Sequence, residues 1–269
     1  MSGLRVRLEP LKKPARGNLN IPGLSRLSLT SRTDLQYFKS QMTPQEMEKE
    51  QIRLSPDVVI PPAGQGYSAS PDDVVFALDI QYVGNTAFIG LHAQELQGKV
   101  RGQFVGTFDT DVEYVPGLFA FREAPPLLQM IKATTATGLV PQILLVDGHG
   151  IAHPRRFGAA CLVGVSSGLP TIGCAKETLL PFEGELVSHR GGTLPVLLKG
   201  EQVGSVLRSQ KDIRPVFVSP GHMICLAESE KVILELSSKY RVCDPLRFAD
   251  QLARNHARKE TIKGVQVLT

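Results

Sequence analysis

The apolar runs of this chain change their pattern partway along, and this change constrains the fold more than any other feature. Val74–Tyr82 and Thr86–Ala93 are β-rich runs separated by Gly84-Asn85, and a third run follows over 101–110. Such runs joined by short turns predict an antiparallel meander. From Gly117 onward, helical and strand-like segments alternate, which predicts parallel strands with helical crossovers. We therefore expect an α/β domain with a mixed sheet flanked by helices.

The boundaries of several elements can be predicted from capping residues and breakers. Thr43-Pro44 suits a helix start, with Glu46 reaching back to the cap, and that helix should end before Pro56. Further helices are expected over 117–132, 157–166 and 226–237 and from Asp244 onward, and further strands over 142–146, 170–175, 203–208 and 215–219.

The net charge of +4 is concentrated at one end of the chain. Residues 1–33 hold seven basic residues and one acid, giving +6, so the remainder carries −2. Three interpretations of this segment stay open: an arm for nucleic acid or an anionic surface, a solvated leader, and a targeting peptide. We expect residues 1–33 to be a basic disordered leader, 34–260 to form one domain, and 261–269 to be a short tail.

Composition excludes several classes of protein. No stretch approaches 18 consecutive apolar residues, which excludes a membrane span, and no apolar core near the N-terminus suggests a secretory signal. The cysteines form no CxxC pair, which argues against a zinc ribbon and a disulfide scaffold and fits a reducing cytosol. We expect a cytoplasmic monomer with four free cysteines: Cys161, Cys174, Cys225 and Cys243.

Two aspartates interrupt or follow buried strands. Asp79 lies within the apolar run Val74–Tyr82, and Asp147 follows the run 142–146 and precedes Gly148. If the two strands are neighbours, their backbones lie ~4.8 Å apart. Carboxylates at that spacing repel unless a cation lies between them, and a hard ion such as Mg²⁺ or Mn²⁺ is the natural partner. A cap or turn role for Asp147 is the alternative.

Other polar residues have both a functional and a structural interpretation. Glu123 could be a first-turn helix acid stabilised by the helix dipole. Lys176 could contact a phosphate or be solvated, and His153–Arg156 could be a phosphate contact or a charged turn. His222 precedes a helix, where a base, a ligand and a surface residue are all possible.

Taken together, seven segments resemble the endonuclease V family, inosine-directed nucleases with a ribonuclease-H-like fold. They occur in the family's order and spacing and span roughly residues 45–260. The matching segments are Ala77–Asp79, Tyr114–Gly117, Phe121–Glu123, Leu144–Gly150, His153–Gly158, Gly173–Lys176 and Val218–His222.

The resemblance implies roles for the polar residues. Asp79, Asp147 and Glu123 would hold a catalytic Mg²⁺, for which Mn²⁺ can substitute, with Lys176 near the phosphate and His222 near the metal and attacking water.

It also implies how a lesion is recognised. Tyr114 and Pro116 would form a wedge that fills the space left by an extruded hypoxanthine. The base would lie against Gly117 and Gly148, with Leu179 in the wall and His153 among the substrate contacts. The expected activity is Mg²⁺-dependent repair of deoxyinosine-containing DNA, by cleavage at the second phosphodiester bond 3′ to the lesion.

Three alternatives remain at this point. The substrate could be inosine in RNA, since contacts that distinguish a 2′-hydroxyl cannot be identified in the sequence. The chain could be a catalytically silent nucleic-acid-binding module, although the polar set above argues against this. It could also be another ribonuclease-H-like enzyme such as a junction resolvase, against which the wedge counts.

Overall fold

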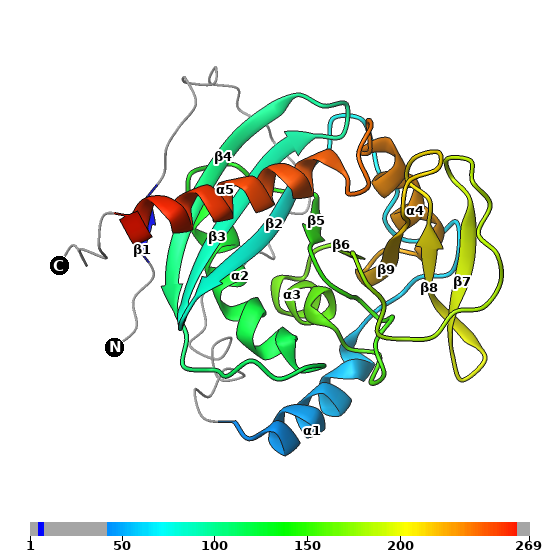
Figure 1. Ribbon diagram of the computed structural model, residues 1–269, viewed down its shortest axis with the longest axis horizontal. Coiled ribbons are helices and arrows are strands. Elements are labelled where there is room, and N and C mark those ends of the chain that lie inside the picture. Colours follow the sequence, from blue (N-terminus) through cyan, green and yellow to red (C-terminus); the bar gives the residue numbers. More distant parts are fainter. Residues whose placement is uncertain (1–4, 8–41, 263–269) are drawn as a thin grey trace.

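The computed structural model describes residues 5–7 and 42–262, and within them the strands form one nine-stranded sheet (Figure 1). The strand order is β1-β4-β3-β2-β5-β6-β9-β8-β7. The strands are β1 (Arg5–Arg7), β2 (Val74–Val83), β3 (Thr86–Glu95), β4 (Val100–Asp109), β5 (Ile143–Val146), β6 (Thr171–Ala175), β7 (Thr193–Leu198), β8 (Glu201–Leu207) and β9 (Val216–His222). The α-helices are α1 (Pro44–Leu54), α2 (Phe119–Thr135), α3 (Ala159–Ser167), α4 (Leu226–Glu235) and α5 (Asp244–Ile262).

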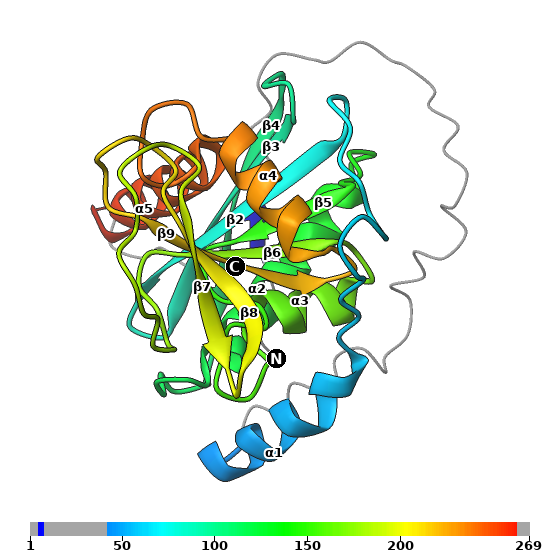
Figure 2. The ribbon, with the colours of Figure 1, turned by 90° about the vertical axis from the view of Figure 1, so that its right-hand side faces the viewer.

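Helices cover both faces of the sheet (Figure 2). Successive side chains of the central strands point to opposite faces, so each strand packs against helices on both sides. Phe76 and Leu78 of β2 point into a core shared with α2 and α3. Their neighbours Val75 and Ala77 point to the opposite face, into a core shared with α4 and α5. A strand buried on both faces needs apolar residues at consecutive positions, which is the pattern that predicted it.

The meander is confirmed, because β2, β3 and β4 pair antiparallel in sequence order. Parallel pairing joins β2 to β5 and β5 to β6. Beyond them β9 and β8 pair antiparallel, so the parallel part of the sheet is shorter than the alternating pattern suggested. Strand β7 was not predicted; it lies at the edge of the sheet and contains Pro195, a residue that is tolerated at a sheet edge.

The first helix begins as predicted. Thr43 and Glu46 form reciprocal cap bonds, with the backbone N–H of Thr43 donating to Oε2 of Glu46 at 2.8 Å. Within the expected leader, β1 pairs antiparallel with β4. The rest of the leader and most of the expected tail lie outside the described residues, so the domain limits stay a prediction. None of the helices in 42–262 is long and apolar enough to cross a bilayer.

Candidate active site

Asp79 and Asp147 lie side by side because their strands are neighbours in register. Leu78 of β2 pairs with Val146 of β5, and each aspartate is the next residue along its strand. The backbone N–H of Asp147 also donates to the carbonyl of Leu78 at 3.3 Å. Burial, and next the charge of Asp147, raises the pKa of Asp79 well above its usual value. The two carboxylates therefore share one electrostatic environment.

Glu123 of helix α2 lies close enough to Asp147 for their charges to interact. It lies on the first two turns of α2, and burial followed by the charge of Asp147 raises its pKa from 4.5 to about 8. A surface acid in a first helical turn would not show this response. The geometry therefore favours the functional interpretation of Glu123 over the purely capping one.

Lys176 supplies the positive charge nearest to these acids. It follows β6, and its Nζ forms an ion pair with Oδ2 of Asp147. Burial alone would lower the pKa of Lys176, but the carboxylates of Asp147 and Asp79 outweigh burial and raise it. Its side chain remains 43% exposed, so it can still contact a ligand.

A further acid, Asp250 of α5, was not predicted. Its charge contributes to the raised pKa of Asp79 and of Lys176. The helix comes this close because Gly90 pairs with Asp79 and a β-carbon on Gly90 would collide with the backbone of Ala249. The absence of a side chain at Gly90 thus brings Asp250 to the edge of the sheet beside Asp79.

His222 lies elsewhere, so the prediction that it accompanies the acids is wrong. It pairs with Thr171 at the start of β6, whereas Lys176 follows the end of β6. Thr171 and Ala175 are four residue steps apart along β6, or about 13 Å at ~3.3 Å per residue. Nδ1 of His222 accepts a hydrogen bond from the backbone of Val59 at 3.2 Å. The buried ring therefore has a structural partner away from Asp79 and Asp147.

A cavity of about 250 Å³ lies between α2 and the loops after β5 and β6. Glu123 and Asp147 form part of its wall. The predicted substrate residues in its lining are Gly117, Gly148, His153 and Leu179. The structure thus brings the expected base-binding residues and two of the expected metal ligands to one cavity.

Tyr114 and Pro116 lie on the loop before α2, next to this cavity. The Tyr114 side chain is 64% exposed, and its ring packs on Phe119 with centroids 4.6 Å apart. The loop is anchored by Arg122, a buried residue of the Phe121–Glu123 segment whose guanidinium donates to the carbonyls of Val112 and Gly84. An exposed aromatic ring on an anchored loop is the geometry that a wedge requires.

His153 lines the cavity, but its ring nitrogens have partners in the protein. Nε2 donates to the carbonyl of Gly117 at 3.0 Å, and Nδ1 accepts from the backbone of Arg155 at 3.2 Å. Burial lowers the pKa of His153 to about 4, so the ring is neutral near pH 7. A substrate contact by His153 would have to displace one of these bonds.

The chemistry of the acidic group fits a hard divalent cation. The four acids Asp79, Glu123, Asp147 and Asp250 outnumber the cations beside them, which are Lys176 at Asp147, Arg254 at Asp250 and Arg122 near Glu123. An excess of negative charge therefore remains when the acids are ionised, and carboxylate oxygens are the ligands that hard divalent ions prefer. Lys176 occupies one Asp147 oxygen, and within 42–262 no three Asp, Glu, His or Cys side chains already form a compact ligand set.

Known proteins resemble this chain in sequence and in structure. Endonuclease V of Azotobacter vinelandii is 46% identical over 148 residues, covering 55% of this chain and 66% of that protein, which is just under two thirds of its length. The solved structure of endonuclease V from Streptomyces avermitilis has a TM-score of 0.74 and 32% identity, covering 82% of this chain and 96% of that one.

A third relative was solved with nucleic acid. Endonuclease V of Ciona intestinalis, in complex with a 24mer DNA containing an inosine followed by a ribo-adenosine, has a TM-score of 0.69 and 25% identity, covering 80% of this chain and 98% of that one. The likenesses confirm the expected ribonuclease-H-like fold. The profile of the endonuclease V family matches residues 65–251, a range that includes Asp79, Glu123, Asp147 and Asp250. The chain therefore belongs to the endonuclease V family.

Proposed function

We propose that this protein is a divalent-metal-dependent endonuclease that recognises deoxyinosine in DNA and hydrolyses the second phosphodiester bond 3′ to it. The observation that supports this most strongly is the shared cavity wall. Gly117 and Gly148, expected to contact the base, and Glu123 and Asp147, expected to hold the metal, line the same cavity. A strand whose deoxyinosine base lies in this cavity would therefore pass close to the acids with the phosphates that follow the lesion.

Each residue has a part in this proposal. Asp79, Asp147 and Glu123 hold a divalent ion, with Asp250 adding negative charge, and Mg²⁺ or Mn²⁺ suits these oxygen ligands. When bound, such an ion polarises the scissile phosphate and lowers the pKa of a water molecule. Lys176 lies beside Asp147 and neutralises charge on the phosphate.

The wedge and the cavity divide the work of lesion recognition. The exposed ring of Tyr114, followed by Pro116, fills the gap in the base stack. The hypoxanthine enters the cavity, where Leu179 supplies apolar wall and the backbones at Gly117 and Gly148 approach it closely. Extruding the base costs the stacking energy between that base and its neighbours in the duplex, and the wedge compensates for part of this cost.

The test is nicking of a duplex with a single deoxyinosine, with Mg²⁺ or EDTA, and with a normal duplex as control. We expect one cut at the stated position, dependent on Mg²⁺. Asp79→Asn and Asp147→Asn should abolish it while the protein stays folded, and Asp57→Asn, an exposed acid away from the cavity, should retain it. Cleavage that survives in both site variants would contradict the metal assignment.

A second candidate substrate is inosine in RNA. The Ciona intestinalis relative was solved with a DNA in which a ribo-adenosine follows the inosine, which motivates a test of ribonucleotide strands on this chain. Matched strands with deoxyinosine or inosine, cut under single-turnover conditions, separate the two possibilities.

We also propose that the protein is monomeric and cytoplasmic, since a reducing compartment suits its four buried free thiols. The leader is proposed to bind DNA without sequence specificity.

A further inference from the structure

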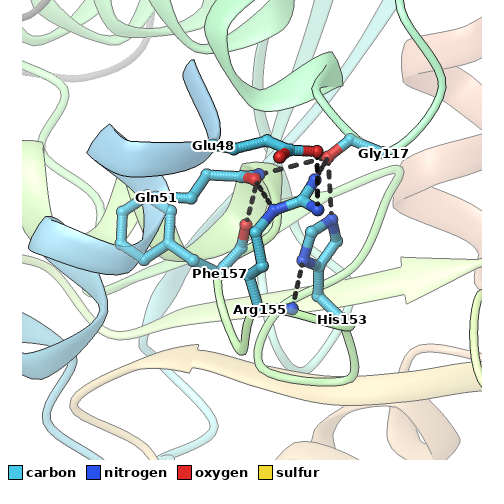
Figure 3. Close-up of polar contacts among 6 residues, drawn as sticks. All are labelled: Glu48, Gln51, Gly117, His153, Arg155 and Phe157. Carbon is cyan, nitrogen blue, oxygen red and sulfur yellow. Dashed lines mark hydrogen bonds and ion pairs between the residues drawn. The ribbon is translucent and has the colours of Figure 1, made fainter. Parts of the chain in front are cut away.

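The carbonyl of Gly117, the last residue of the wedge segment Tyr114–Gly117, accepts three hydrogen bonds (Figure 3). The donors are Nε2 of Gln51 at 3.2 Å, Nε2 of His153 at 3.0 Å and Nη2 of Arg155 at 2.9 Å. A carbonyl oxygen has two lone pairs, so this one has no capacity left for a ligand. Its partners hold the end of the wedge in place.

Gln51 is the centre of this arrangement. It lies on α1, its side chain is fully buried, and its Nε2 also donates to the carbonyl of Phe157 at 2.9 Å. Its Oε1 accepts from Nε of Arg155 at 2.5 Å, and Arg155 is held from outside by Glu48 at 3.2 Å. Both ends of the amide are therefore used, as a buried polar group requires.

Gly117 connects the wedge to the acidic group. Its φ of +77° is a conformation that favours glycine, and a β-carbon there would lie 3.4 Å from Nη2 of Arg155. The next residue, Leu118, is the N-cap of α2 and donates its N–H to Val115 at 3.0 Å. A contact that fixes Gly117 thus fixes the loop that carries Tyr114 and the start of the helix that carries Glu123.

We propose that Gln51 is a positioning residue for lesion recognition: through Gly117 it holds the wedge in the posture that replaces an extruded base. This inference rests on the proposed function. Gln51 lies on helix α1, outside the residues 65–251 that match the family model. We call the hydrogen bonds from Gln51 and Arg155 to the carbonyl of Gly117 the clamp. If the clamp is broken, the wedge loop is ordered only when DNA binds, and the conformational entropy of ordering one backbone residue lowers affinity by about 5- to 30-fold.

The test compares Gln51→Met with wild type on duplexes with and without one deoxyinosine. Methionine keeps the length and burial of the side chain and removes its hydrogen bonds. Single-turnover nicking gives the half-saturating enzyme concentration and the maximal rate, and competition gives affinity for the normal duplex. A 2-aminopurine beside the lesion reports unstacking. Glu50→Gln is the matched control, because Glu50 lies on the same helix and contacts exposed Arg53.

We expect Gln51→Met to raise the half-saturating concentration on the deoxyinosine duplex by about 5- to 30-fold. Affinity for the normal duplex and the maximal rate should stay close to wild type, and the 2-aminopurine signal should fall. Arg155→Lys, which keeps the charge but removes the bonds to Gln51 and Gly117, should behave alike. If Gln51→Met lowers the melting temperature, Arg155→Lys becomes the decisive variant, because in it Gln51 keeps its hydrogen bond to the carbonyl of Phe157.

The possible results separate the inference from the proposed function. If wild type shows no preference for deoxyinosine, the proposed function fails and the inference fails with it. If wild type shows the preference and both clamp variants match Glu50→Gln, only the inference is overturned. An equal loss of affinity for both duplexes would show a purely structural role for Gln51 and would also overturn it.

Discussion

Glu123→Gln removes a titratable acid from the cavity wall, and the structure predicts that its effect on stability depends on pH. Burial of the carboxyl group, followed by the charge of Asp147, raises the pKa of Glu123 from 4.5 to about 8. Below pH 4.5 both the folded and the unfolded chain hold this proton. As pH rises toward 8, the unfolded chain releases it first, so wild type loses stability that the glutamine variant keeps.

The size of the effect follows from the span of the shift. Each pH unit between 4.5 and about 8 is equivalent to ~1.4 kcal/mol, so the loss in the free energy of unfolding reaches up to ~5 kcal/mol. Asp79 adds to the fall in wild type and in the variant alike, because its pKa is raised too, so their difference isolates Glu123. A bound divalent cation favours the ionised carboxylate, so Mg²⁺ should remove most of the difference.

The measurement is urea unfolding at pH 5 and pH 8, in EDTA and in Mg²⁺. In EDTA, Glu123→Gln should match wild type near pH 5 and exceed it by several kcal/mol at pH 8, while nicking with Mg²⁺ is abolished. Glu185→Gln, an exposed acid that does not line the cavity, serves as control and should follow wild type. Parallel pH profiles for wild type and Glu123→Gln would refute the assigned environment of this carboxyl group.

Three further predictions concern the wedge, the acidic group and the leader. Tyr114→Ala should weaken the preference for a deoxyinosine duplex by ~1–3 kcal/mol, with melting unchanged because the ring is mostly exposed; equal losses on both duplexes in a titration would contradict a wedge role. In nicking assays Asp250→Asn should lose most activity and His222→Gln should retain it, and the opposite order would contradict the register of β9. Deleting residues 1–33 should flatten the salt dependence of affinity for all DNA, since each neutralised phosphate adds about −0.9 to the slope of log affinity against log salt; an unchanged slope would favour a targeting or inert leader.

The centre of the sheet could be predicted because burial on both faces leaves a local signature. Val74–Tyr82 has consecutive apolar positions, and a single acid within it, Asp79, is conspicuous. From the sequence alone, it could only be assumed that this strand is a neighbour of the strand before Asp147. The structure shows that it is, because Leu78 pairs with Val146. Local pattern thus identified the two acids, and tertiary structure supplied their proximity.

Other site residues have no local signature. Gln51 is one of several polar residues on an amphipathic helix, and only the fold shows that its amide reaches Gly117 and Phe157, which lie far along the chain. Strand β7 alternates between exposed positions and inward-facing ones, of which Val196 is fully buried, and it contains Pro195, which cannot donate a backbone hydrogen bond to a neighbouring strand. Both cases depend on long-range neighbours that periodicity does not report.

Asp250, and not the predicted His222, lies beside the acids, and the direction of strand β9 is one reason. His222 ends a strand and precedes a helix, a position that borders the acids only if β9 runs parallel to β5. Because β9 runs antiparallel to β6, its last residue, His222, lies beside the start of β6, whereas Lys176 follows the end of β6. Asp250, in contrast, lies within α5 and pairs with Arg254 one turn further along the same helix. It reaches the acids because Gly90, the partner of Asp79 in the meander, leaves room for the backbone of α5. A substitution that adds a side chain at Gly90 should therefore displace Asp250 and reduce nicking before it unfolds the sheet.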